Sequence, residues 1–240
     1  MKRFFVLFLS LLLSSVAFAE GDRDKTISRI DDAGTVLNEI MSAPDSGIPE
    51  EIFGSAKCVA VVPSLLKGGL GLGAQYGKGV ASCRTDKGWS APVFFTVKGG
   101  SFGLQIGAQA VDLVMVIMNE NGMKALLSSK FKLGADGSVA AGPVGRHAEG
   151  STDWKMRAEV LTYSRARGIF AGITLNGAVI AQSKDDTRAF YGRMVPFRTI
   201  LNGNVEAPSE SSPFLTALGK YSGTSPAPAA APASSTSPGK

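Results

Sequence analysis

The chain has 240 residues, 44% of them hydrophobic, and a formal net charge of +5. Removal of an N-terminal export signal, described below, takes away Lys2 and Arg3 and lowers this charge to +3. So small a positive charge on an exported chain argues against a nucleic-acid partner. The single histidine, His147, and the two cysteines do not stand at metal-ligand spacing, so the sequence predicts neither a metal site nor a cofactor.

The N-terminus has the three parts of a secretory signal peptide. Lys2 and Arg3 form the basic part, residues 4–13 the apolar part, and Ala17-Phe18-Ala19 the cleavage site. The alternative, a membrane anchor, needs about 20 apolar residues, which is more than this run contains. No cysteine near the cleavage point offers a site for a lipid anchor. We therefore expect residues 1–19 to be removed, and the mature protein to be periplasmic or secreted, soluble or peripherally bound to a membrane.

Helical patterns begin the mature region. Apolar residues recur at helical spacing from Asp24 to Met41, with Asp31, Asp32 and Glu39 on much of the other face, which predicts an amphipathic helix. Residues 48–51, Ile-Pro-Glu-Glu, then have proline and carboxylates where a second helix begins.

Strand patterns follow, separated by short turn signals. The predicted strands cover residues 58–63, 70–76, 79–84, 91–98, 102–109, 111–118, 139–144, 158–165, 168–175 and 179–182. The predicted turns are residues 77–79, 85–88 and 98–101 and the tight hairpin signal Asn176-Gly177. Short connections favour antiparallel hairpins, and dense glycine within strands favours bends or close backbone packing. The sequence therefore predicts an α+β fold with a strongly curved, glycine-rich antiparallel sheet, either barrel-like or a sandwich.

Short helical segments complete the predicted domain. They cover residues 123–129, 183–191, 196–201 and 213–218, and Ser183 or Asp185 is a candidate cap for the second. Pro, Ala, Ser and Thr dominate from Ser222 onward, and such a segment cannot bury a core. The predicted organisation is a signal peptide at 1–19, one domain at 20–205, a short helical extension at 206–221 and a disordered tail at 222–240.

The glycine-rich region contains two patterns that need an interpretation. Residues 69–74 fit G-x-G-x-x-A, but another predicted strand follows instead of the helix whose N-terminus binds pyrophosphate, so we reject a dinucleotide site. The second pattern is an internal echo, in which Lys67-Gly68-Gly69 and Gly73-Ala74-Gln75 resemble Lys98-Gly99-Gly100 and Gly107-Ala108-Gln109. Two copies do not indicate a solenoid.

The two cysteines, Cys58 and Cys83, lie in neighbouring predicted strands of a chain that we expect to be exported. An even pair in an oxidising compartment is a candidate disulfide. Two buried thiols that act as small hydrophobic side chains are the alternative.

The sequence favours a binding protein over an enzyme. It contains neither a G-x-S-x-G nor an H-E-x-x-H motif. A catalytic triad would need His147, whose glycine-flanked position is more typical of an exposed loop. Asp112 interrupts an apolar strand, either as a buried functional carboxylate or as a residue that faces a polar side or accepts backbone hydrogen bonds. We therefore assign no catalytic residue.

Basic residues accompany the predicted glycine turns. If these turns gather at one end of the sheet, the residues form a cationic rim for phosphate head groups; otherwise they are solvated turn residues. The candidate lipid-binding residues are Lys67, Lys78, Lys98, Arg146, Arg165 and Arg167.

An ordered series of segments between about Asp24 and Leu201 resembles the SYLF domain family. The segments are residues 48–49, 56–63, 79–80, 88–92, 103–107, 141–146, 163–164, 167–172 and 190–192. The resemblance implies binding of phosphoinositides and other membrane lipids, and exported bacterial members are generally called lipid-binding proteins. Yeast members also bind actin, which we do not carry over, because a bacterium that exports this protein offers it no such filament.

The resemblance leaves two hypotheses about function. Some animal members insert a basic amphipathic helix into the bilayer, whereas the matching helix here has Lys25 and Arg29 against more carboxylates. We therefore expect a non-enzymatic exported protein that binds phosphatidylinositol or another anionic phospholipid through the basic residues at the glycine-rich turns. The alternative is a structural or partner-binding envelope protein that needs no lipid.

Overall fold

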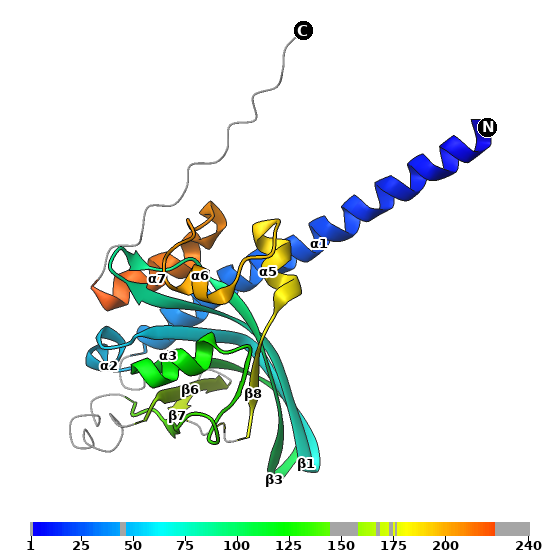
Figure 1. Ribbon diagram of the computed structural model, residues 1–240. Helices are drawn as coiled ribbons and strands as arrows, with labels where there is room; N and C mark the ends of the chain where they lie inside the picture. The colour runs from blue at the N-terminus through cyan, green and yellow to red at the C-terminus, as the bar shows by residue number, and fades with distance from the viewer. Residues whose placement is uncertain are drawn as a thin grey trace.

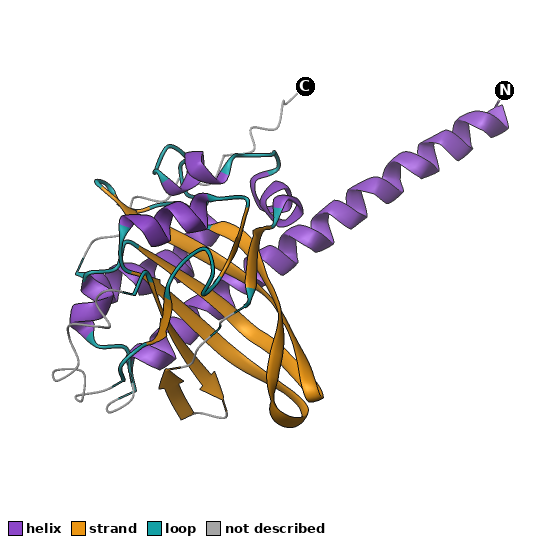
Figure 2. Ribbon diagram, turned by 60° about the horizontal axis from the view of Figure 1, so that its bottom comes forward, coloured by secondary structure: helices purple, strands orange, loops and turns teal. Residues whose placement is uncertain are grey.

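The computed structural model describes residues 2–43, 47–144, 158–166, 169–172, 175 and 177–223. The helices are α1 (Lys2–Met41), α2 (Glu50–Gly54), α3 (Glu120–Leu127), α5 (Lys184–Tyr191), α6 (Phe197–Leu201), the 3₁₀ turn η2 (Ser209–Ser211) and α7 (Ser212–Ser222). The strands are β1 (Cys58–Thr85), β2 (Gly88–Trp89), β3 (Val93–Ile117), β4 (Lys130–Lys132), β5 (Val139–Ala141), β6 (Val160–Ala166), β7 (Ile169–Gly172) and β8 (Val179–Gln182). The predicted α+β class is confirmed, with a sheet that curls into a half-barrel and helices packed against it (Figures 1 and 2).

One long ribbon of two strands dominates the sheet. β1 and β3 pair antiparallel from Cys58 opposite Ile117 to Ala81 opposite Val93. Both strands reverse direction near their middle, so that the ribbon folds back on itself (Figures 1 and 2). We call residues 70–72 and 102–106 the ribbon tip, and the parts on either side of it the two arms. The remaining strands flank the arms, in the order β2-β1-β3-β6-β5, with β8 beside β3 and all pairings antiparallel except that of β5 with β6.

The predicted turns at residues 77–79 and 98–101 are wrong. These residues lie inside continuous strands, where Gly77 pairs with Val97 and Gly99 with Gln75. Glycine is needed at this point for close approach of the two arms: a Cβ on Gly79 would lie 2.5 Å from the carbonyl oxygen of Val61. The predicted turn at residues 85–88 is confirmed, since it joins β1 to β2.

The internal echo of the sequence has a structural meaning. Residues 67–69 pair with residues 107–109, and residues 73–75 pair with residues 99–101. The two copies therefore face each other across the ribbon, on either side of its tip. Small side chains in both strands of both arms are consistent with a ribbon that bends sharply there.

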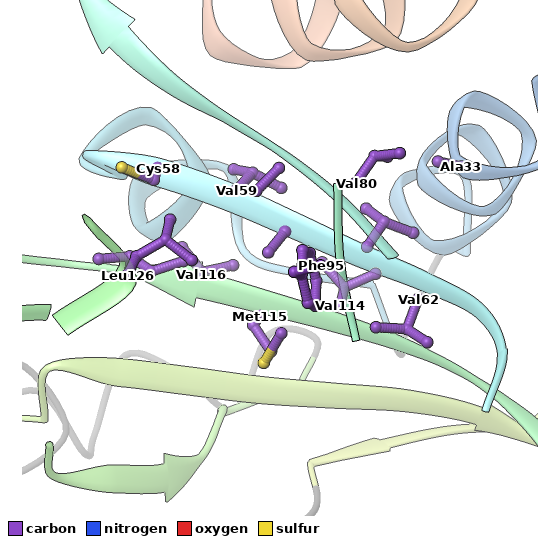
Figure 3. Packing of buried hydrophobic residues seen from close by; sticks show 14 of the residues in the cluster. Ala33, Cys58, Val59, Val62, Val80, Phe95, Val114, Met115, Val116 and Leu126 are labelled. Atoms are coloured by element: carbon purple, nitrogen blue, oxygen red, sulfur yellow. The ribbon is translucent and has the colours of Figure 1, made fainter. Parts of the chain in front are cut away.

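The core lies between the arms of the ribbon and the helices. Ile30, Leu37 and Ile40 of α1 are fully buried, so the apolar face of the predicted amphipathic helix packs into the protein. Figure 3 shows Val80 beside Ala33 of α1, and Val59 and Phe95, which come from the two arms, along the ribbon. Phe214 and Leu218 of α7 belong to the same core, and the segment predicted as an extension therefore packs on the domain.

The predicted Asn176-Gly177 hairpin is wrong, although Gly177 occupies a turn with a φ of 84°. Asn176 itself lies outside the described residues. β7 pairs with β6, whereas β8 enters between β3 and β4 and bonds to both. The turn is held to β4 instead, because Gly177 N–H donates to the carbonyl of Leu133 over 2.8 Å.

Helix α1 runs without a break from Lys2 to Met41, and its N-terminal half projects away from the sheet (Figure 1). The core residues of this helix, Ile30 to Ile40, all lie beyond position 19. Within the described residues, no helix combines the length and the apolar character required to cross a membrane.

Candidate functional site

The cysteines hold the ribbon closed. Cys58 and Cys83 lie in the same strand, β1, and not in neighbouring strands, yet they form a disulfide because the strand folds back. Their Cα atoms are 3.9 Å apart, and both side chains are fully buried. Beside them, Arg84 N–H donates to the carbonyl of Lys57 over 2.7 Å. The disulfide therefore holds the two ends of β1 together, which is a structural role.

Asp112 has a structural contact that accounts for its place in an apolar strand. One carboxylate oxygen accepts a hydrogen bond from the backbone N–H of Ser64 over 3.0 Å. Ser64 has a φ of 57°, in the left-handed region, within the irregularity between Val62 and Leu65 of β1. The carboxylate thus stabilises a backbone bulge, which favours the second of the two interpretations of this residue.

Arg165 also belongs to this network. Its guanidinium donates to the other oxygen of Asp112 from Nε over 2.9 Å and from Nη2 over 2.6 Å. A second ion pair links it to Glu39 of α1. Arg165 therefore joins α1, β3 and β6, and two carboxylates already neutralise its charge.

Lys78 is engaged in a similar way. Its Nζ lies 3.0 Å from one oxygen of Asp186, and Arg29 Nη1 lies 3.2 Å from the other oxygen. Ser183 Oγ donates to the same carboxylate over 2.9 Å. The side chains of Arg29 and Asp186 are each only 12% exposed, so this cluster ties α1, β1 and α5 together.

Lys67 and Lys98 differ from these two cations. Each lies in an arm of the ribbon near its tip, and Lys98 Nζ stands 5.6 Å from the ring centroid of Tyr76. Lys67 is half-buried, and this burial lowers the pKa of its ammonium group. An ammonium group that has lost part of its hydration gains more from a nearby anion than a fully solvated one does.

Two grooves meet at an exposed apolar pair beside these lysines. A groove of about 280 Å³ lies between α1 and β1, and one of about 400 Å³ lies along the ribbon beside Lys67. Both are lined by Leu66 and Tyr76, whose exposures are 57% and 44%. We call Leu66, Lys67, Tyr76 and Lys98 the ribbon surface, and it is the candidate functional site.

Four of the six predicted lipid-binding residues lie within the described part of the chain, and these four are not all free cations. Lys78 and Arg165 bind carboxylates from other elements, whereas Lys67 and Lys98 share the ribbon surface. Arg146 and Arg167, like His147, lie outside the described residues. Sequence reasoning missed Leu66 and Tyr76, because no strand was predicted over Leu66 and the sequence does not show which side chains of β1 are exposed.

The described residues contain no group of three His, Cys, Asp or Glu side chains arranged to hold a metal ion. The chemistry of the ribbon surface is instead that of two cations beside an apolar pair. Such a surface can bind a ligand that carries both an anionic group and an apolar part.

Comparisons with known proteins identify relatives of this chain. The sequence profile of the Ysc84 family, described as Las17-binding protein actin regulator, matches residues 98–221. The SH3 domain-containing YSC84-like protein 1 of Rattus norvegicus is 33% identical over 182 residues, which cover 75% of this chain and 53% of that protein. Protein YSC84 of Saccharomyces cerevisiae is 31% identical over 185 residues, covering 75% of this chain and 39% of that protein.

A further yeast relative, named LAS seventeen-binding protein 3, is 31% identical over 185 residues, covering 75% of this chain and 40% of that protein. The chain thus spans about half the length, or less, of the curated relatives it matches. These relatives have the names of binding or regulatory proteins and not of enzymes.

Proposed function

Since the chain belongs to the Ysc84 family, which is the SYLF domain family, we propose that it is a non-enzymatic protein that binds anionic phospholipids, phosphatidylinositol among them, at a membrane surface. The observation that carries the proposal is the ribbon surface, where Lys67 and Lys98 flank exposed Leu66 and Tyr76. A lipid head group supplies the phosphate for the lysines, and the bilayer supplies an apolar phase beside it.

Export is part of the proposal. The N-terminal sequence has the parts of a cleavable signal, and removal of residues 1–19 leaves the α1 residues of the described core in place. N-terminal sequencing of the product from an exporting cell is expected to start at Glu20. A product that retains Met1, or one that is lipid-modified at its terminus, would contradict export of a soluble protein.

The test of lipid binding removes together Lys67 and Lys98, which form no ion pair with another described residue. Each basic residue near an anionic bilayer contributes about 1 kcal/mol, so Lys67→Ala/Lys98→Ala should bind vesicles of phosphatidylcholine with phosphatidylinositol about 30-fold more weakly at low salt. Co-sedimentation across a salt series measures this, and salt should weaken the wild type in the same direction.

A matched control removes the same charge elsewhere. Lys87→Ala/Lys220→Ala alters two exposed lysines at the other end of the ribbon and on α7, and Lys220, like Lys98, stands over a tyrosine ring. We expect this variant to bind vesicles within about threefold of the wild type, because its lysines lie far from the proposed contact. Equal losses in the two double variants would show that only net charge matters and would refute a specific role of the ribbon surface.

A protein partner is the second candidate. The names of the matched family and of one yeast relative refer to binding of Las17, and binding of a protein by this chain is the corresponding proposal. It predicts that the purified protein binds no vesicle of any composition. Co-sedimentation therefore separates the two candidates.

A further inference from the structure

We propose that the ribbon tip enters the interfacial layer of the bilayer, so that membrane binding has an apolar component in addition to the attraction of lysines to phosphates. This proposal rests on the lipid binding proposed above and specifies which part of the molecule meets the membrane and how deeply.

The first argument is the distribution of charge along the ribbon. Residues 68–77 and 99–111 contain no charged side chain, although they include the whole tip. Lys67, Lys98 and the Asp186-paired Lys78 lie at three ends of these segments, and Asp112, paired with Arg165, lies at the fourth. The tip is the end of the ribbon that points away from the helices (Figures 1 and 2). An uncharged projection bounded by lysines complements a bilayer, whose apolar interior lies beneath a layer of phosphates.

The second argument is where large apolar side chains are exposed. Among the residues whose side chains the structure describes, the large hydrophobic ones that are exposed are Leu66, Tyr76 and Met194. Two of these three stand together beside the tip, and both line the two grooves there. An exposed apolar pair next to cations is typical of an interaction site, and a tyrosine suits the boundary between head groups and acyl chains.

The geometry limits the depth of insertion. Gly71 lies four residues beyond Lys67, and at about 3.3 Å per residue the tip reaches about 13 Å past the lysine. A ribbon of two strands has unpaired backbone groups along its outer edges, and these cannot be satisfied in hydrocarbon. Since this length exceeds the thickness of the head-group layer, the ribbon should lie tilted, with the tip and Tyr76 at the boundary of head groups and acyl chains and the long side chains of Lys67 and Lys98 extending back to the phosphates.

A neutral substitution of the apolar pair tests the proposal. Leu66→Ser/Tyr76→Ser keeps the net charge, and both positions are exposed, so the fold should be retained. Met194→Ser, 41% exposed and located between α5 and α6, is the matched control. At about 1 M salt the Debye length is about 3 Å, so the binding that remains is mainly apolar. We expect the double variant to lose at least tenfold in vesicle affinity there, and the control to bind like the wild type.

A depth measurement gives a direct readout. Tyr76→Trp places a fluorescent side chain at the ribbon surface, and bromine atoms on the acyl chains quench a tryptophan that reaches them. With vesicles of phosphatidylcholine and phosphatidylserine, we expect quenching of this variant well beyond that of the parent protein, which contains two tryptophans.

The outcomes separate this inference from the proposed function. If the lysine variant loses binding at low salt while Tyr76→Trp is not quenched and the serine variant binds like the wild type at high salt, lipid binding stands and insertion is refuted. If the wild type binds no vesicle, both proposals fail, and the ribbon surface is left to a protein partner.

Discussion

Removal of the disulfide should cost a large part of the stability of this protein. Cys58 and Cys83 are 25 residues apart, and the loop-entropy relation for that length gives about 12 cal/mol/K, or about 3.5 kcal/mol at 25 °C. Both side chains are fully buried, so replacement by alanine also leaves small voids that raise the loss. Domains of this size are typically stable by about 5–15 kcal/mol. Cys58→Ala/Cys83→Ala should therefore remain folded but with a much lower unfolding midpoint.

Urea unfolding followed by circular dichroism measures this loss, with and without a reducing agent. The wild type should lose stability when it is reduced, and the double variant should be insensitive to the reductant. Thiol titration of the denatured, unreduced wild type should find no free thiol. A difference below about 1 kcal/mol between the oxidised wild type and the variant would refute the argument that the bond restricts the unfolded chain.

Three further predictions concern single side chains. Asp112→Ala should cost about 3 kcal/mol in urea unfolding and Asp112→Asn only about 1–2 kcal/mol, because asparagine still accepts the hydrogen bond from the backbone; equal losses would contradict this. Gly79→Ala should lower the free energy of unfolding by at least about 2 kcal/mol, because the new Cβ would lie 2.5 Å from a backbone oxygen of the other arm. Gly100→Ala, whose nearest atom is 3.8 Å away, should change it by less than about 0.5 kcal/mol. Thermal melts compare the two, and similar melting temperatures would refute the close approach of the arms at Gly79. A hydrogen bond from Arg23 lowers the pKa of Glu210 in the folded protein. The stability from this bond is therefore fully present above the usual glutamate pKa of about 4.3 and is lost as the pH falls through the lower folded value. Glu210→Gln should make the free energy of unfolding depend less on pH in this acidic range, and an unchanged dependence would exclude this contribution.

Local patterns predicted the elements that depend on nearby residues. The helical periodicity of residues 24–41 falls within α1, and the strand at residues 179–182 matches β8. The helix at residues 183–191 matches α5 to within one residue. In each case a short window contains the information, because spacing and capping act over one or two turns.

The ribbon could not be predicted from its glycines. A pair such as Gly77 and Gly79 is as typical of a turn as of two strands that approach each other closely, since both need a residue without a side chain. Which of the two occurs depends on residues on the other arm, such as Val61 and Val62, that pack against Gly79. This information is tertiary, and the sequence pattern of a single strand does not contain it.

Only part of the candidate site could be predicted, because the rest again depends on tertiary contacts. Lys67 and Lys98 were recognised from their charge and their position beside glycines. Lys78 has the same charge and also lies beside glycines in the sequence. Its charge is neutralised by Asp186, which is 108 residues away in the chain, so the sequence around Lys78 does not reveal the ion pair. Exposure of Leu66 could not be predicted, because it lies between two predicted strands and because successive residues of β1 such as Val61 and Val62 are both fully buried.

The folded-back ribbon also sets an order of events for folding. Ala81 and Val93 are only 12 residues apart, and each further pair toward Cys58 and Ile117 lies next to a pair that is already formed. The ribbon can thus grow as a zipper from the β2 connection, without closing a long loop in one step. Cys58 reaches Cys83 only after the zipper has passed the tip and the second half has returned along the first. Oxidation of the pair should therefore follow the pairing of β1 with β3, and the disulfide then marks a completed ribbon.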